Sequence, residues 1–367
     1  MKIFHTSDWH IGKLLHKENL ISEQREVLIK FLDDIDRKKP DIVIVAGDIY
    51  DTSIPRIEAI ELLDDIMNEI ISRDIALIII SGNHDSAERL SFGNKMFRKN
   101  GLYIITDYED IESPLVFEDE FGKVNFYPFP FITVARGKQV FSSENEKEPI
   151  ESYDKLAEVS IKKALKNFNS KERNIAIYHG FLMKLNDKDI PITSESERPL
   201  SIGGTDFIDI KHFEKFDYIA LGHLHRPQKV GYENIRYSGS IMKYSFSEYN
   251  HKKGYYEIDL KEKNNIDIKF NEIYPKRDIR VVEGRLEELL KEEYSDDYIL
   301  IRLYADGEIY EPKARLSKVF PNILHMEIIK NKSIEKKENI NIKNKLKRKD
   351  IFGLFEDFYE DSTDRKF

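Results

Sequence analysis

The chain of 367 residues contains no cysteine. Disulfide bonds and thiolate metal sites are therefore excluded, and the absence fits a reducing compartment without requiring one. No stretch approaches the roughly 18 consecutive apolar residues that predict a membrane span. No signal-peptide pattern follows Met1 either, because Lys2 leads straight into a strand-like segment, Ile3–Thr6. We expect a cytoplasmic protein with no membrane association.

A nucleotide-binding signature is also missing. The chain has no Gly-x-x-x-x-Gly-Lys-Ser/Thr segment, so it should not bind ATP through a P-loop. Its formal net charge of −9 argues mildly against nucleic acid, whose binding proteins usually present a basic surface. Bound cations would reverse the local sign of metal-binding carboxylates, however. From Lys330 to Lys349, moreover, nine Lys or Arg stand against two Glu, and this run could contact phosphate or could be a solvated linker.

The first third of the chain alternates predicted strands and helices. Apolar segments predict strands over residues 3–6, 41–46 and 76–80. Apolar residues at helical spacing predict helices over Ser22–Lys39, with Ser22 as N-cap, and over Pro55–Arg73. This β-α-β-α-β order predicts a parallel sheet. Functional groups of such sheets gather beyond the C-terminal ends of the strands.

Shorter elements are predicted in the middle of the chain from apolar runs and turn residues. In chain order they are a hairpin over residues 116–127, a loop to about 152, a helix over 153–168, a strand over 175–178, a polar surface loop over 184–205, a strand over 218–221 and antiparallel strands within 236–260. The strand over 175–178 would deliver His179, and the strand over 218–221 would end at His223 and His225.

The pattern changes near residue 278, and a length of 367 residues suggests about two domains. We expect a large domain over residues 1–277 and a small α/β domain over 278–331, with one of its helices over Arg285–Glu293. Residues 332–367 would form a basic linker and a short aromatic segment. That segment is too short for a core of its own, so its apolar side chains should dock on the body or on a partner.

Two polar motifs follow the first two predicted strands. Asp8 and His10 stand two apart, so both side chains can point to the same side of an extended segment, although such pairs usually only decorate loops. Asp48 follows a buried strand beside Gly47, a position that suits a metal ligand; the alternative is a helix cap. We expect Asp51 to cap or orient the same loop, and Trp9 to pack beneath the site.

The motif after the third strand is Gly82-Asn83-His84-Asp85. The side-chain carbonyl of Asn83 suits a hard cation. His84 could be a ligand or a proton donor, and Asp85 could accept a hydrogen bond from the ring of His84 and set its tautomer. A simple turn without chemistry is the alternative.

His223 and His225, two apart after a strand, could hold two neighbouring cations or could be exposed loop residues. We expect the histidines outside the motifs to be structural or surface residues: His5, His16, His212, His251 and His325. Taken together, the oxygen and nitrogen donors that follow the strands are numerous enough for two metal ions that share one carboxylate: Asp8, His10, Asp48, Asn83, His179, His223 and His225. Such donors suit manganese, iron or zinc. Paired metals stabilise the attacking and leaving oxygens of phosphoester hydrolysis.

This ordered set resembles the calcineurin-like metallophosphoesterase superfamily over residues 1 to about 260. More narrowly, the sequence is similar to the SbcD family, the nuclease subunits of bacterial SbcCD complexes. The segments that carry the similarity are Phe4–Lys13, Ala46–Thr52, Ser81–Ser86, Leu221–Gln228 and Tyr237–Ser240. The resemblance implies an α/β fold, a sandwich of two mixed β-sheets flanked by helices. It also implies a small α/β cap domain that helps hold DNA and a C-terminal helical tail.

The resemblance also implies roles for individual residues. One manganese ion would be held by Asp8, His10, Asp48 and His225, and the other by Asp48, Asn83, His179 and His223. His84 would be the catalytic histidine that is not a ligand, with Asp85 behind it. An SbcC-type ATPase would dock on the C-terminal segment, where the matching apolar residues are Leu354, Phe355, Phe358 and Tyr359. A homodimer within a heterotetramer is implied as well.

The implied activity is that of a manganese-dependent nuclease in DNA repair, recombination and replication. It would cut hairpins and single strands as an endonuclease and, with the ATPase, degrade duplex ends as a 3'-5' exonuclease. A small-molecule phosphodiesterase or phosphatase on the same frame is one alternative, against which the second domain and the aromatic tail argue. A non-catalytic scaffold that binds DNA ends is another, opposed by the complete ligand set.

Overall fold

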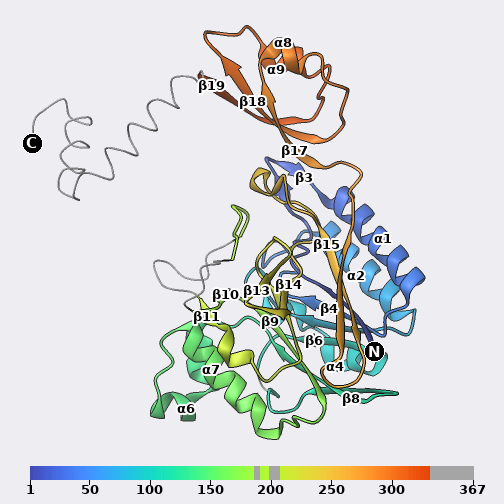
Figure 1. Cartoon of the computed structure of the whole chain (residues 1–367), viewed down its shortest axis with the longest axis vertical. Coiled ribbons are helices and arrows are strands. Elements are labelled where there is room, and N and C mark those ends of the chain that lie inside the picture. Colours follow the sequence, from blue (N-terminus) through green and yellow to red (C-terminus); the bar gives the residue numbers. More distant parts are fainter. Residues whose placement is uncertain (109, 186–190, 198–206, 331–367) are drawn as a thin grey trace, which may run out of the picture. The chain divides into compact units, whose positions relative to one another are not determined.

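The computed structural model describes residues 1–108, 110–185, 191–197 and 207–330 (Figure 1). The chain divides into two compact units, Met1–Ile279 and a second that begins at Arg280. The basic run after Lys330 and the segment predicted to dock the ATPase lie outside the described residues. In the part of the chain that is described, no helix is long and apolar enough to cross a membrane.

The first unit contains two six-stranded sheets. The strands of the first sheet, in spatial order, are β16 (Ile266–Glu272), β15 (Gly254–Leu260), β1 (Lys2–Thr6), β4 (Ile42–Ala46), β5 (Ala76–Ile80) and β6 (Leu102–Ile105). β1, β4, β5 and β6 run parallel, as predicted for the first three strands of this group, whereas β15 is antiparallel to both of its neighbours.

The second sheet is also mixed. Its strands, in spatial order, are β13 (Gln228–Val230), β14 (Tyr232–Tyr237), β12 (Tyr218–Gly222), β9 (Arg173–His179), β8 (Gly122–Phe129) and β7 (Leu115–Asp119). The four central strands are parallel, and each edge strand closes an antiparallel pair. The predicted hairpin over residues 116–127 is therefore confirmed as β7 and β8.

The two sheets pack face to face around one apolar core. Ile44 and Ile78 of the first sheet belong to the same buried cluster as Phe126, Ile175 and Tyr218 of the second. Successive strand residues point to opposite faces, which is why an unbroken apolar run such as β4 is buried on both sides. The predicted sandwich of two mixed sheets is confirmed.

Helices cover the outer faces of both sheets (Figure 1). On the first sheet these are α1 (Ile21–Lys38) and α2 (Ile57–Ile71), each with one buried apolar face. The prediction of Ser22 as N-cap is wrong: Ser22 lies inside α1, because Oδ1 of Asn19 already accepts the N–H of Ile21 (3.1 Å) at the start of the helix.

On the second sheet, α7 (Tyr153–Ala164) begins where it was predicted. The hydroxyl of Ser152 accepts the N–H of Lys155 (3.1 Å) and caps this helix. The predicted loop to residue 152 is wrong in part, since it contains α5 (Val134–Val140) and α6 (Ser142–Lys147). Phe141 between them is fully buried, and such a tertiary contact leaves no periodic signal in so short a segment.

The antiparallel strands predicted within residues 236–260 are present as the end of β14 and as β15, each with an antiparallel partner, but these two strands do not pair with each other. β14 lies in the second sheet and β15 in the first, and β15 pairs with β1 and with β16, which was not predicted. The loop between β14 and β15 therefore passes from one sheet to the other. The remaining short elements of this unit are β2 (Leu14–Leu15), β3 (Glu18–Asn19), α3 (Ala87–Leu90), α4 (Asn94–Phe97), β10 (Leu182–Met183) and β11 (Ile208–Asp209).

The described part of the second unit is a small α/β structure with a core of its own. Its elements are β17 (Ile279–Gly284), α8 (Leu286–Leu289), β18 (Tyr298–Ala305), α9 (Pro312–Leu316) and β19 (Ile323–Lys330). They alternate as predicted, and the three strands form one sheet in the order β17-β18-β19. The helix predicted over Arg285–Glu293 is shorter, because only its first turn buries leucines against β18.

Candidate metal centre

All seven predicted metal ligands lie at the C-terminal ends of strands from both sheets. β1 and β4 are followed after one intervening residue by Asp8 and Asp48, β5 leads to Asn83, and β9 ends at His179. β12 ends immediately before His223, with His225 two residues later. Strands of the two sheets contact each other across the sandwich, so these ends converge.

The ligands fall into two groups of three whose donor atoms lie within 4.8 Å of one another: Asp8, His10 and His225, and Asp48, His179 and His223. In the first group, the Nε2 atoms of His10 and His225 face each other at 3.0 Å. In the second group, Oδ1 of Asn83 lies 3.0 Å from Nε2 of His179 and 3.0 Å from Nδ1 of His223.

Asp48 lies between the two groups. Its Oδ2 is 3.6 Å from Nε2 of His10 and 3.5 Å from Nε2 of His179, so one oxygen faces both groups. Its Oδ1 accepts the N–H of His84 (2.9 Å), which fixes the rotation of the carboxylate. The arrangement suits a carboxylate shared by two cations.

The two buried carboxylates of this centre, Asp8 and Asp48, favour the binding of cations. Asp8 and Asp48 are only 0% and 2% exposed, and neither forms an ion pair with Lys or Arg within the described residues. Burial raises the pKa of Asp8 to about 8, an effect that the charge of Asp48 reinforces. Buried carboxylates without such partners are costly unless a metal ion compensates them. Oxygen and imidazole donors in this number fit two divalent cations.

Three of the four ligand imidazoles are held in the neutral form, which is the form that binds metal ions. Burial lowers the pKa of His10, His223 and His225, so these rings are neutral near pH 7. Although burial opposes it, the neighbouring Asp48 raises the pKa of His179 to about 9. Nδ1–H of His179 donates to the carbonyl of Ala46 (2.8 Å), which leaves Nε2 directed into the centre.

His84 lies beside the ligands with its ring against that of His10, the centroids 4.6 Å apart. Its Nδ1–H donates to the main-chain carbonyl of Asp51 (2.8 Å), so that Nε2 faces the centre, 4.0 Å from Oδ2 of Asp48. His10, Asp48 and His84 are also close enough to form a third potential metal group.

The predicted hydrogen bond from the ring of His84 to Asp85 is wrong, because Nδ1–H of this ring donates to Asp51. Instead, the carboxylate of Asp85 accepts three main-chain N–H groups, those of Ile49 (3.1 Å), Tyr50 (3.0 Å) and Gly82 (2.8 Å). Asp85 thus ties the loop after β4 to the loop after β5. Asp51 orients its own loop as expected, since its Oδ1 lies 2.8 Å from Nζ of Lys13.

Motif glycines allow the ligand loops to approach each other closely. A Cβ on Gly47 would lie 2.2 Å from Nδ1 of His179, and one on Gly82 would lie 2.2 Å from Oδ1 of Asp48. One on Gly222 would lie 1.9 Å from the Ala46 carbonyl that orients His179. The glycine in each motif is therefore required by the ligand of another motif.

Several ligands also adopt a strained backbone. Asp8, His10, Asp48 and His223 have positive φ angles of 51°, 42°, 51° and 110°. Residues other than glycine rarely adopt such conformations, which cluster at functional sites where the surrounding structure holds them. Here main-chain hydrogen bonds join the first two loops, from Asp8 to Gly47 (3.0 Å) and from His10 to Asp48 (3.0 Å).

Side chains far away in the sequence support the centre, and sequence reasoning missed them. Nε2 of Gln24 donates to the main-chain carbonyls of Trp9 (3.0 Å) and His10 (2.7 Å), and the hydroxyl of Tyr244 donates to the former. Trp9 is fully buried beneath the site, as expected. His5 is likewise structural: it lies between the hydroxyl of Tyr218 and a main-chain carbonyl.

The predicted polar loop over residues 184–205 is confirmed where it is described, since residues 184–185 and 191–197 form no helix or strand and are mostly exposed or partly exposed, but the prediction missed that this loop contacts the centre. Within residues 191–197, the hydroxyl of Ser196 lies 2.8 Å from Nδ1 of His225, and Oε1 of Glu197 accepts the main-chain N–H of His225 (2.7 Å). Burial raises the pKa of Glu197 to about 7. No sequence pattern indicated these contacts, which join segments about thirty residues apart.

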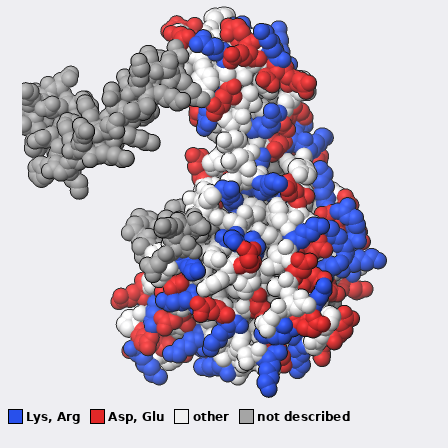
Figure 2. All heavy atoms as spheres, viewed as in Figure 1, with Lys and Arg blue, Asp and Glu red and all other residues white. Residues whose placement is uncertain are grey.

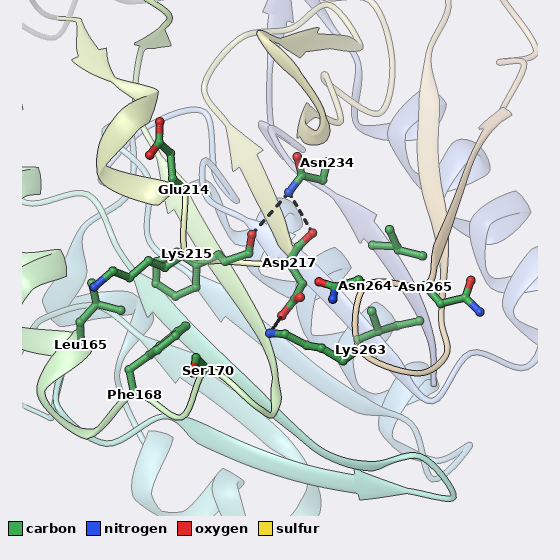
Figure 3. A pocket seen from close by; sticks show the side chains of 13 residues that line it. Leu165, Phe168, Ser170, Glu214, Lys215, Asp217, Asn234, Lys263, Asn264 and Asn265 are labelled. Carbon is green, nitrogen blue, oxygen red and sulfur yellow. Dashed lines mark hydrogen bonds and ion pairs between the residues drawn. The ribbon is translucent and has the colours of Figure 1, made fainter.

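Two of the pockets formed by the described residues of the first unit bear on the location of the substrate. One, of about 1310 Å³, opens at Asn83 and is lined by residues of the loop after β5, α4 and α5. The other, of about 760 Å³, lies near the N-terminal ends of β9 and β12, away from the ligands (Figure 3). Two of its charged side chains, Asp217 and Lys263, pair with each other at 2.7 Å. Of these two pockets, the first adjoins the centre and the second does not.

Comparison with known proteins agrees with this geometry. Residues 1–227 match the family described as calcineurin-like phosphoesterase, and residues 275–363 match the type 5 capsule protein repressor C-terminal domain. The chain is 36% identical over 370 residues to the SbcD subunit of the nuclease SbcCD of Staphylococcus epidermidis, with 100% of this chain and 94% of that protein covered. The chain belongs to the SbcD family of calcineurin-like phosphoesterases.

A second relative of this SbcD-family chain is the corresponding SbcCD nuclease subunit of Staphylococcus saprophyticus, 34% identical over 373 residues, with 99% and 93% of the two proteins covered. This chain is also similar to a dimetal phosphatase from Danio rerio in its crystal structure. The alignment covers 74% of this chain and 96% of the phosphatase chain, with 11% sequence identity and a TM-score of 0.43. The phosphoesterase match ends after His225 and so includes all seven clustered residues. The Asp and His clusters are thus suited to bind divalent metal in a phosphoesterase domain.

Proposed function

We propose that this chain is a metal-dependent DNA nuclease that hydrolyses phosphodiester bonds with two divalent cations, and that Mn²⁺ is the ion used in the cell. The observation that carries the proposal is the pair of ligand groups on either side of Asp48. The names of the two staphylococcal relatives support the nuclease assignment. A cytoplasmic location would give such an enzyme access to chromosomal DNA.

In this proposal, Asp8, His10 and His225 would hold one cation, Asn83, His179 and His223 would hold the other, and Asp48 would be available to both. A pair of divalent ions makes water acidic enough to attack at neutral pH and stabilises the attacking and leaving oxygens of an in-line displacement. The protein contributes fixed ligand loops and a buried site, in which charges interact more strongly than in water.

We assign His84 as the group that donates a hydrogen bond to the phosphate or the leaving oxygen. Its Nδ1–H is held by the carbonyl of Asp51, so Nε2 is the atom that can carry a proton toward substrate. Because the ring contacts His10 and lies near Asp48, a phosphodiester at the cations would be within its reach. Asp85 acts on the loops and not on this ring.

The pocket at Asn83 supports DNA as the substrate. Its volume of about 1310 Å³ exceeds the roughly 300–1,000 Å³ of pockets for small ligands. Lys95 and Arg98 line it, and neither forms an ion pair with another described residue, so both are available to phosphate oxygens. On the face drawn in Figure 2, basic and acidic side chains are interleaved. We therefore expect phosphate contacts in the pocket rather than across a wide basic surface.

The remaining parts of the proposal concern partners. Four strongly exposed apolar side chains of the first unit would suit a homodimer: Ile54 (69%), Ile57 (73%), Phe92 (84%) and Met96 (74%). We further propose a nuclease domain over residues 1–277, a cap domain over 278–331 that helps hold DNA, and docking of an SbcC-type ATPase on the segment after residue 332. With that ATPase, the chain would act as a 3'-5' exonuclease on duplex ends in DNA repair, recombination and replication.

The test uses the purified chain with Mn²⁺ on a DNA hairpin, on single-stranded DNA and on a small aryl phosphodiester. Cleavage of DNA that Asp8→Ala and His84→Ala both abolish would support a nuclease. Turnover of the small ester beside intact DNA would point instead to a small-molecule phosphodiesterase. Binding of DNA ends without cleavage of any substrate would point to a scaffold.

A further inference from the structure

A buried ion pair lies directly behind one of the predicted metal ligands. Glu248 is fully buried, and its Oε2 is 2.5 Å from Nζ of Lys253, which is itself 5% exposed. The other carboxylate oxygen, Oε1, lies 3.1 Å from Nδ1 of His225. Desolvation of a buried charge pair often costs more than the attraction returns. A contribution to folding stability therefore does not by itself explain why the charged pair of Glu248 and Lys253 is buried at this position.

The contacts of this pair converge on His225. Lys253 donates not only to Glu248 but also to the main-chain carbonyl of His225 (2.7 Å) and to the hydroxyl of Ser240 (2.7 Å). Nδ1 of His225 thus faces both Oε1 of Glu248 (3.1 Å) and the hydroxyl of Ser196 (2.8 Å), which itself donates to Oε1 of Glu248, while Lys253 holds the main chain of His225. Nε2 is left free and faces the centre, 3.0 Å from Nε2 of His10.

Other ligand imidazoles are held differently. Nδ1 of His179 donates to a neutral main-chain carbonyl, that of Ala46 (2.8 Å). Nδ1 of His10 is 3.5 Å from Oδ1 of Asp51, too long for a good hydrogen bond. A carboxylate at hydrogen-bond distance makes the opposite ring nitrogen a stronger metal donor than a carbonyl does. This asymmetry sets His225 apart from His10 and His179.

We propose that Glu248 is a positioning residue for the metal ligand His225. Its carboxylate accepts Nδ1–H directly and through the hydroxyl of Ser196, holds Nε2 toward the cation and strengthens it as a donor, while Lys253 keeps the carboxylate in place. The inference rests on the proposed function, because it assumes that His225 binds a cation. It predicts that Glu248 affects the site of Asp8, His10 and His225 and leaves the other site unchanged.

The test compares Glu248→Gln with the wild-type chain in a Mn²⁺ titration followed by electron paramagnetic resonance of the free ion. We expect two sites in both proteins, with the affinity of one lowered about 10- to 100-fold in the variant and that of the other unchanged. The control is Glu257→Gln, which also removes the acid of a lysine pair, with Lys38 at 2.7 Å, but on β15 away from the ligands. Thermal unfolding is measured alongside, since a purely structural role would lower Tm and spare both affinities.

Wild-type affinity at both sites of a folded Glu248→Gln variant would overturn the proposal. If the variant does not fold, two-bond ¹H–¹⁵N spectra of the wild-type chain show which ring nitrogen of His225 carries the proton. These spectra are recorded for the metal-free chain and for the Zn²⁺-loaded chain. We expect His225 to carry its proton on Nδ1 in both, and a proton on Nε2 would overturn the proposal. A wild-type chain that binds no Mn²⁺ would overturn the proposed function, whereas the metal-free spectrum would still test the pairing of Glu248 with His225.

Discussion

Gly82→Ala tests how closely the ligand loops must approach each other. Gly82 is not among the residues with positive φ, so alanine adds no backbone strain there. The new Cβ would lie 2.2 Å from Oδ1 and 2.3 Å from the main-chain nitrogen of Asp48, whereas ordinary contact begins near 3.4 Å. One of the two loops must therefore move by about 1 Å, the scale of misplacement that costs activity.

The size of the effect follows from the role that we propose for Asp48, a ligand shared by two cations. Displacement of a shared ligand by about 1 Å should lower kcat/KM on single-stranded DNA roughly 100-fold. That factor equals about 2.7 kcal/mol of lost transition-state stabilisation. Overpacking should also lower the free energy of unfolding by about 1–3 kcal/mol. Because Oδ1 of Asp48 accepts the N–H of His84 (2.9 Å), the same movement disturbs His84.

The assay measures kcat/KM with Mn²⁺, the number of Mn²⁺ sites and thermal unfolding. Gly307→Ala is the matched control, since a Cβ on Gly307 meets nothing within 4 Å. The control should behave as wild type. If Gly82→Ala retained wild-type kcat/KM and bound both ions with wild-type affinity, close approach would not explain the glycine and the argument would be wrong.

Three further predictions concern catalysis, acid stability and DNA binding. His84→Gln should slow cleavage about 100- to 1000-fold while two Mn²⁺ sites remain; loss of one site would instead make His84 a ligand. Although burial opposes it, hydrogen bonds from Arg173 and the N-terminal ammonium hold the pKa of Asp119 well below its usual range. That contribution to stability is present above about pH 4 and is lost as the pH falls. Asp119→Asn should therefore flatten the fall of Tm below pH 4, and an unchanged curve would refute this. Replacing Lys95 and Arg98 together by Gln should reduce the salt slope of single-strand binding by about 1.4, and a slope equal to that of wild type would exclude both as phosphate contacts.

The convergence of the ligands could be predicted from sequence because it follows from strand order. Buried apolar runs placed Asp8, Asp48 and Asn83 after parallel strands, and the C-terminal ends of such strands meet at one edge. His179 and His223 belong to the other sheet, and their arrival at the same point depends on how the two sheets face each other. Only the resemblance to a known family could anticipate that packing.

The supporting residues could not be predicted in this way. Glu248 and Lys253 lie in a loop that passes between the sheets, and the sequence around them gives no sign that they reach His225. Asp85 was predicted to accept a hydrogen bond from the ring of His84 because the two residues are adjacent. Its carboxylate oxygens instead accept main-chain N–H groups of another loop. Contacts between loops depend on tertiary packing, which local periodicity does not record.

The most direct test of two cations that share Asp48 is a crystal structure of the chain grown with Mn²⁺, with anomalous data collected near the manganese edge. We predict two anomalous peaks, both within bonding distance of Asp48, one beside Asp8, His10 and His225 and the other beside Asn83, His179 and His223. A single peak, or a second peak away from Asp48, would contradict the shared-carboxylate centre on which the proposed nuclease rests.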